Sequence, residues 1–175
     1  MEEAGRDVKR WRAGIVPMVD VPQAWPLVAE WVEASLAHSV QHEWTPGDVF
    51  ASCVRGEYLM LLIGDARAPV WGPDALSGVA ILCQNSNPEG QPYTGLICCG
   101  GRQVESWLEE LWRVTVGIAA AAGTTKIIAV GRPGWKKILY PLGARERATI
   151  VAYELTPEDV ARGWNAREAE GLKHG

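Results

Sequence analysis

The most constraining feature of the sequence is a long amphipathic segment between two short apolar ones. Residues 105–122 carry large apolar side chains at intervals of three and four, the period of a helix with one buried face. Residues 93–99 and 126–130 are short and apolar, and they predict strands. Two strands joined by a helix of this length pair in parallel through a right-handed crossover. The chain is therefore expected to contain a strand-helix-strand unit.

The strands before this helix are expected to run antiparallel. Residues 57–64, 76–84 and 93–99 read as strands, and the loops between them, 65–74 and 85–92, are rich in Pro, Gly, Asn and Asp. Short polar loops join antiparallel neighbours, so these strands predict a meander. A meander followed by a parallel crossover makes a mixed central sheet. The predicted fold class is therefore α/β.

Helices are predicted on both sides of these strands. Apolar residues recur at helical spacing over 21–42 and predict a first amphipathic helix that begins near Pro22 or Pro26. Thr45 followed by Pro46 predicts a capped second helix over 46–55. After the crossover we expect a short helix from 133 or 134 to 141, a strand over 147–155 and a C-terminal helix over 157–170. Residues 1–175 are thus predicted to form one domain.

Composition excludes several classes of protein. The net charge of -4 is spread among interspersed acidic and basic residues, so nucleic acid is an unlikely partner. No apolar run reaches membrane-spanning length, and we expect a cytoplasmic protein that does not enter a membrane. The four cysteines lack Cys-x-x-Cys spacing and predict buried thiols. His38 and His42 share a helix face without a third ligand, so no metal site is expected.

Two segments resemble a known family. They are Thr94 to Trp107 and Lys126 to Gly143, the second containing the run Gly-Arg-Pro-Gly-Trp at 131–135. Together with the helix that ends at Gly123, they resemble the GNAT-like proteins, with the acyl-CoA N-acyltransferase fold, that tailed bacteriophages and prophages encode. The resemblance is sharpest over 94–145. It implies the GNAT fold.

The resemblance also implies a site for acetyl-CoA. In this family the cofactor lies between two splayed parallel strands, and a Gln/Arg-x-x-Gly-x-Gly/Ala loop wraps its pyrophosphate at the start of the next helix, where free N–H groups favour anions. Carried over, the motif falls on Gln103 to Leu108, with Leu108 where the family has glycine or alanine. The implied pantetheine contacts are Leu96, Ile97, Cys98 and Cys99, and the implied pyrophosphate contacts are Gln103, Val104, Glu105, Ser106 and Trp107. The alternative is an ordinary strand-to-helix turn retained for folding.

The implied catalytic and substrate residues lie in the following segment. The family's acid is commonly a tyrosine four residues before the glycine that ends the last short helix. Here Tyr140 is three residues before Gly143, and Leu139 has the customary position. Arg132 and Trp135 are candidates to bind substrate. The alternatives are a helix-end tyrosine packed on the sheet and a solvated charge on a tight turn docked by Trp135.

Two functions follow from the resemblance. The first is an acyl-CoA-dependent N-acyltransferase that moves an acetyl group from acetyl-CoA to a small-molecule or protein amine. The second is a catalytically inert GNAT-fold protein that serves a phage as an accessory, virion or host-interaction component, as a homodimer or as part of the phage structure. Binding of CoA separates the two.

Overall fold

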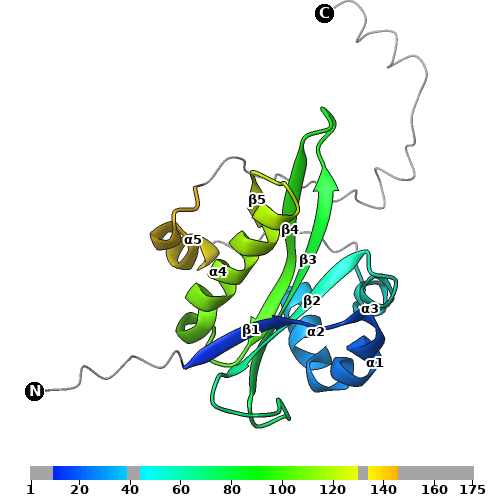
Figure 1. Ribbon diagram of the computed structural model, residues 1–175, viewed down its shortest axis with the longest axis vertical. Coiled ribbons are helices and arrows are strands. Elements are labelled where there is room, and N and C mark those ends of the chain that lie inside the picture. Colours follow the sequence, from blue (N-terminus) through cyan, green and yellow to red (C-terminus); the bar gives the residue numbers. More distant parts are fainter. Residues whose placement is uncertain (1–9, 39–43, 130–133, 146–175) are drawn as a thin grey trace, which may run out of the picture. The chain divides into compact units, whose positions relative to one another are not determined.

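The computed structural model describes residues 10–38, 44–129 and 134–145, and within them it contains a five-stranded mixed sheet (Figure 1). The strands lie in the order β1-β2-β3-β4-β5. The first four pair antiparallel and β4 pairs with β5 in parallel, which confirms the predicted α/β mixed sheet. Their bounds are β1 Trp11–Ile15, β2 Tyr58–Asp65, β3 Leu76–Ser86, β4 Pro92–Gly101 and β5 Ile127–Ala129.

Strand β1 was not predicted from the sequence. It lies at the edge of the sheet and pairs with β2 from Trp11 opposite Asp65 to Ile15 opposite Leu61. Its five residues include Ala13 and Gly14, which have little or no side chain, and none of them is fully buried. Too few large apolar residues alternate here to give a period-2 signal. The segment therefore forms a strand because it pairs with β2, and not because of a pattern in its own sequence.

Helices α1 (Val21–Ala24), α2 (Ala29–Ala37) and α3 (Pro46–Val54) cover one face of the sheet. The sequence predicted one helix here, begun near Pro22 or Pro26, whereas the structure has two. A 3-10 turn, Trp25–Leu27, and the non-helical residue Val28 (φ -132°) separate α1 from α2. Pro26 lacks the N–H that a continuous helix would need at this position. Helix α3 matches the predicted 46–55 closely, whereas 39–43 lie outside the described residues.

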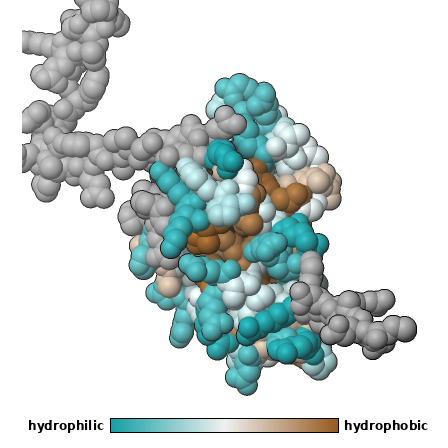
Figure 2. Space-filling model, turned by 90° about the vertical axis from the view of Figure 1, so that its left-hand side faces the viewer, coloured by the Kyte–Doolittle hydropathy of each residue, from teal (hydrophilic) through white to brown (hydrophobic). Residues whose placement is uncertain are grey.

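Helices α4 (Val104–Ala121) and α5 (Gly134–Leu139) cover the other face, and a 3-10 turn, Tyr140–Leu142, follows α5. The indole of Trp107 is fully buried beneath β3. Gly78 makes room for it, since a Cβ there would lie 2.5 Å from Cζ2 of the indole. The face of the molecule that carries α4 and α5 has an apolar area bordered by hydrophilic side chains (Figure 2).

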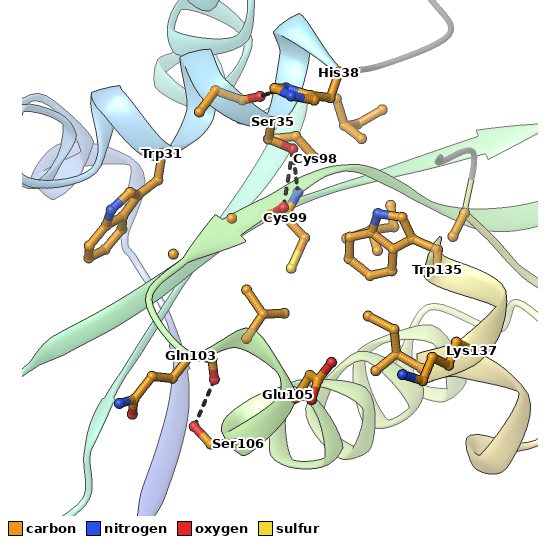
Figure 3. A pocket seen from close by; sticks show the side chains of 18 residues that line it. Trp31, Ser35, His38, Cys98, Cys99, Gln103, Glu105, Ser106, Trp135 and Lys137 are labelled. Atoms are coloured by element: carbon orange, nitrogen blue, oxygen red, sulfur yellow. Dashed lines mark hydrogen bonds between the residues drawn. The ribbon is translucent and has the colours of Figure 1, made fainter. Parts of the chain in front are cut away.

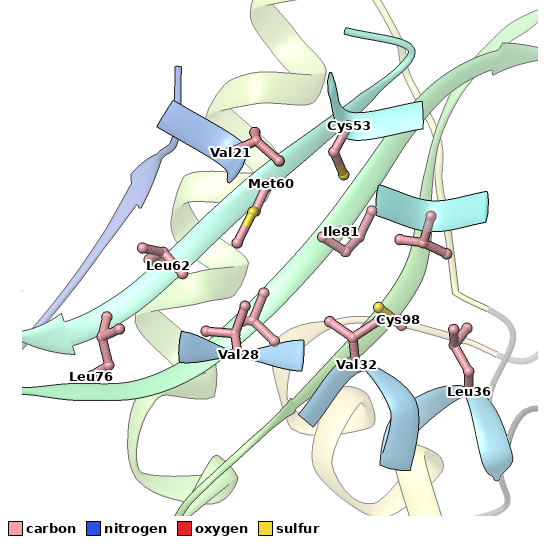
Figure 4. Packing of buried hydrophobic residues seen from close by; sticks show 12 residues of the cluster. Val21, Val28, Val32, Leu36, Cys53, Met60, Leu62, Leu76, Ile81 and Cys98 are labelled. Atoms are coloured by element: carbon pink, nitrogen blue, oxygen red, sulfur yellow. The ribbon is translucent and has the colours of Figure 1, made fainter. Parts of the chain in front are cut away.

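The sheet separates two hydrophobic cores. Cys98 belongs to the core under α1, α2 and α3 (Figure 4), and Cys99 belongs to the core under α4 and α5. All four cysteines are free and buried, as predicted. Burial raises the pKa of the Cys53 thiol to about 11 and that of Cys98 to about 12.

Several predictions fall outside the described ranges or concern absences within them. The expected strand 147–155 and C-terminal helix 157–170 lie outside the described residues. Among the helices that the structure describes, none combines the length and apolar character needed to cross a bilayer. The same part of the chain holds no group of three or more acidic, histidine or cysteine side chains suited to a metal ion.

Candidate functional site

The site begins where β4 and β5 stop pairing. The two strands are in register only from Thr94 opposite Ile127 to Leu96 opposite Ala129. Beyond Leu96, β4 continues to Gly101 alongside β3, while within the described ranges no strand pairs with its other edge. Ile97 is an extra, bulged residue, because Leu82 lies opposite Leu96 and Ile81 opposite Cys98. An open strand edge therefore follows the parallel pair.

A cavity of about 860 Å³ lies against this open edge (Figure 3). This volume is within the range of small-molecule sites. The walls come from α2, β4, the start of α4, the end of β5, and α5. The residues that line it are Trp31, Ala34, Ser35, His38, Leu96, Ile97, Cys98, Cys99, Gly100, Gly101, Gln103, Val104, Glu105, Ser106, Ala129, Trp135, Lys137 and Ile138.

Helix α2 forms one wall of the cavity and touches the open edge of β4. The Ser35 hydroxyl donates to the carbonyl oxygen of Cys99 at 3.1 Å, and the Cys99 N–H donates to the same hydroxyl oxygen at 3.2 Å. Gly100 allows this approach, because a Cβ there would lie 2.7 Å from the Trp31 carbonyl oxygen. A helix side chain therefore takes the place of a strand partner at Cys99.

The first turn of α4 forms another wall. Gln103 precedes the helix with a left-handed backbone (φ 52°) and makes no side-chain cap. The N–H groups of Val104 and Glu105 donate to no atom in the described part of the chain, so the positive end of the helix is open to the cavity. The Glu105 carboxylate lies in this same turn. The arrangement offers free donors together with one negative charge.

Comparison with solved structures identifies this architecture. A probable acetyltransferase superposes with a TM-score of 0.61 at 14% identity, over 83% of this chain and 97% of that one. A GNAT family acetyltransferase from Staphylococcus aureus gives 0.56 at 9%, over 83% and 99%. A predicted acetyltransferase from Clostridium acetobutylicum, solved with acetyl-CoA, gives 0.56 at 8%, over 82% and 96%. This chain has the GNAT fold.

These similarities concern the fold, since all three identities are below 15%. No protein-family model and no curated protein sequence matches the chain. The GNAT fold was the predicted one. The cavity lies at the point where the two parallel strands part.

Three titratable side chains line the cavity: His38, Glu105 and Lys137. Nδ1 of His38 lies 2.8 Å from the Ala34 carbonyl oxygen, which can only accept, so this nitrogen carries a proton and Nε2 is the basic atom of the neutral ring.

Arg102 precedes the start of α4, but its guanidinium bonds to backbone atoms outside the cavity lining. Its guanidinium donates to the carbonyl oxygens of Pro73, at 3.0 Å, and Leu76.

Most of the predicted cofactor residues line this cavity. Trp107 does not, because its indole is fully buried in the core, where Nε1–H donates to the Arg102 carbonyl oxygen at 2.8 Å. Leu108 is only 3% exposed and faces the same core, so it leaves the cavity open. The lining residues among those predicted are Leu96, Ile97, Cys98, Cys99, Gln103, Val104, Glu105, Ser106 and Trp135.

The predicted catalytic residue has a different position. Tyr140 is 39% exposed and is not among the cavity-lining residues, whereas Leu139 before it is buried. The one-residue offset from the family pattern places the tyrosine in the 3-10 turn that follows α5. Arg132 lies outside the described residues. Assignment of either residue to catalysis or substrate binding stays a prediction.

The α2 wall was missed by the sequence analysis. Trp31, Ser35 and His38 are four and three residues apart, so they lie on one helix face, next to the stripe of Val28, Val32 and Leu36 that enters the core. In the sequence, a helix face that mixes apolar and polar residues in this way is indistinguishable from an ordinary solvent-exposed face. Only the position of α2 over β4 gives it a role.

Proposed function

We propose that this protein is an acyl-CoA-dependent N-acyltransferase that transfers an acetyl group from acetyl-CoA to an amine. The observation that carries the proposal is the open edge of β4, which faces a cavity of suitable size between a bulged strand and an uncapped helix start. An N-acyltransferase needs a base for the amine, donors for an oxyanion and a channel for the thioester arm.

The residues fit the arm of CoA better than its phosphates. The arm contains amides, and the edge of β4 that β5 leaves after Leu96 offers backbone groups with which an amide can bond. The N–H groups of Val104 and Glu105 suit phosphate oxygens. The Glu105 carboxylate repels phosphate, and Lys137 is the only cationic side chain among the described lining residues that offsets it. When bound, acetyl-CoA would supply the acetyl group as a thioester.

We assign the chemistry on the protein side to two groups. Nε2 of His38 accepts a proton from the ammonium form of the acceptor, because Nδ1 already carries one. The peptide N–H of Ile97 at the bulge stabilises the oxyanion. Trp135, across the cavity, provides an apolar wall for the acceptor. Tyr140 remains the predicted proton donor to the thiolate, and Arg132 a predicted substrate contact.

The deciding experiment is calorimetry with acetyl-CoA and CoA, repeated as a thermal shift. Binding raises the apparent stability of the native state, so we expect heat and an increased Tm at up to millimolar ligand. His38→Ala should reduce the acetyl transfer rate at least tenfold while CoA binding persists. Tyr140→Phe tests the predicted proton donor to the thiolate, and a change of less than twofold in the transfer rate would remove Tyr140 from the mechanism. No binding at millimolar CoA rejects the proposal.

A second function is favoured by two observations. The hydrogen bonds of Ser35 to Cys99 and the carboxylate of Glu105 both oppose a bound CoA. They are consistent with an inert GNAT-fold protein encoded by a phage or prophage, in which the cavity is retained only as part of the fold. Such a protein would co-sediment with phage capsids and would show no thermal shift with CoA.

A further inference from the structure

A side chain of α2 binds both backbone polar groups of Cys99. The N–H and the C=O of Cys99 bond to a single hydroxyl oxygen, that of Ser35, 64 positions earlier in the chain. The N–H and C=O of one strand residue point to the same edge, so these bonds identify the edge of β4 that faces away from β3. This is the edge that β5 leaves after Leu96. The hydroxyl therefore occupies a backbone position that a strand-like ligand would use.

Ser35 cannot easily leave this position. Val32 and Leu36, which flank it on α2, are buried in the core on that side of the sheet. The Trp31 carbonyl lies so close to Gly100 that no side chain would fit between them. The backbone of α2 is thus packed directly onto the end of β4, and only rotation of the Ser35 side chain can free Cys99.

The bulge at Ile97 interrupts the alternation of β4 beyond Leu96, and Cys99 is a residue after it whose N–H and C=O point to the open edge. Ile97 is bulged out of the ladder with β3, and both residues line the cavity. The hydrogen-bonding position at Cys99 is already filled by Ser35. A ligand arm that reaches Cys99 must first displace the two hydrogen bonds of the Ser35 hydroxyl. The bonds that the arm forms there therefore add little to its binding free energy.

We propose that Ser35 is a specificity-determining residue of the donor site, and this rests on the proposed function. Its hydroxyl competes with the amides of the donor arm for Cys99, so that the arm does not pair with β4 at Cys99 while the hydroxyl is bound there. Removing the hydroxyl releases one donor and one acceptor on the strand edge. Donors with an amide-bearing arm should then bind more tightly, whereas ligands that lack the arm should not.

The test measures dissociation constants by calorimetry for wild type and Ser35→Ala, with pantetheine, CoA and adenosine 3′,5′-bisphosphate. Pantetheine has the arm without the phosphates, and the bisphosphate has the phosphates without the arm. We expect Ser35→Ala to bind pantetheine and CoA about fivefold more tightly, the effect of roughly one added hydrogen bond. The affinity for the bisphosphate should not change. Ser52→Ala is the matched control, since it removes a hydroxyl from α3 that bonds Arg55 away from the cavity.

Amide exchange at Cys99 supplies a readout that is independent of turnover. Without ligand, this N–H should exchange faster in Ser35→Ala than in wild type, and pantetheine should restore its protection in the variant. If Ser35→Ala does not fold, Ser35→Cys serves instead, because its thiol is a much weaker donor and acceptor of similar size.

Three results overturn the inference. Equal or weaker pantetheine binding by the variant, with CoA still bound by wild type, makes Ser35 a structural residue and leaves the proposed function standing. An equal gain for the bisphosphate shows that the effect is not specific to the arm. If neither protein binds CoA or pantetheine, the proposed function fails and the inference fails with it.

Discussion

Helices α3 and α4 begin in opposite ways. At α3 the Thr45 hydroxyl accepts from the Asp48 N–H at 3.2 Å, and the Asp48 carboxylate accepts from the Thr45 N–H at 2.9 Å. This is a reciprocal capping box, and proline occupies the first helical position. At α4 the residue before the helix, Gln103, makes no side-chain cap, and its backbone is left-handed. One start is closed by its own side chains, and the other is open.

The difference follows the position of each helix relative to the cavity. The start of α3 does not line the cavity, so its free N–H groups have only the chain itself as a partner. The first turn of α4 does line the cavity and keeps two N–H groups for a ligand. A missing cap costs stability, and at α4 the buried indole of Trp107 compensates by bonding the Arg102 carbonyl. The start of α3 is thus closed within the chain, and under the proposed function the start of α4 binds the ligand.

The largest expected effect is at the anchor of α4. Trp107→Ala should lower the free energy of unfolding by about 3–5 kcal/mol, because it removes a fully buried indole and leaves a cavity beneath β3. Urea unfolding followed by circular dichroism measures the change. Trp107→Phe keeps most of the ring and loses the N–H bond to Arg102, so it should cost less. A loss under 1 kcal/mol for Trp107→Ala would show that α4 is anchored in another way.

The next effect concerns the capped start. Thr45→Ala should lower the free energy of unfolding by about 1 kcal/mol, since it removes the side-chain acceptor of the Asp48 N–H. The affinity for CoA should not change, because the capping box lies away from the cavity. Urea unfolding and calorimetry on the same variant give both values. Altered CoA binding would contradict the separation of the two starts.

The pH dependence of this variant is a further control. Hydrogen bonds from the side chain and backbone of Thr45 hold the pKa of Asp48 below its ordinary value. A carboxylate with a lowered folded pKa stabilises the fold above its unfolded pKa of about 4, and this contribution is lost as the pH falls through the folded pKa. The stability difference between wild type and Thr45→Ala should therefore narrow below about pH 4.

The capped start could be predicted from the sequence, whereas the walls of the cavity could not. Thr45, Pro46 and Asp48 carry the whole signal for α3 within four residues, and the apolar stripe of α4 is equally local. The bond of Ser35 to Cys99 joins residues 64 positions apart, and no local pattern marks it. It depends on how α2 packs on β4.

The resemblance to a known family predicted backbone segments that line the cavity but not the direction of every side chain. It placed most of the lining residues on β4 and the start of α4, because backbone position follows from the order of elements. It also assigned Trp107 to the cofactor, although helical periodicity alone puts this side chain on the core stripe with Leu111. Where a motif and a periodicity disagree, the periodicity decides which way the side chain points.

The smallest expected effect tests the charge at the open start. Glu105→Gln removes the carboxylate from the first turn of α4, where a negative charge stabilises a helix by about 0.3–1 kcal/mol. The variant should be less stable by this amount and should bind CoA and adenosine 3′,5′-bisphosphate about two- to fivefold more tightly at low salt. Pantetheine, which has no phosphate, should bind as before.

Glu109→Gln is the matched control for this charge, because Glu109 is an exposed residue one turn further along α4 and does not line the cavity. It should leave the affinity for both phosphate ligands unchanged. The gain in Glu105→Gln should also shrink as the salt concentration rises, since exposed charges are screened over about 10 Å at 0.1 M. If Glu105→Gln bound the bisphosphate no better than wild type, the open N–H groups of α4 would not be a phosphate site, and the bare start of α4 would differ from that of α3 only in how the helix is anchored.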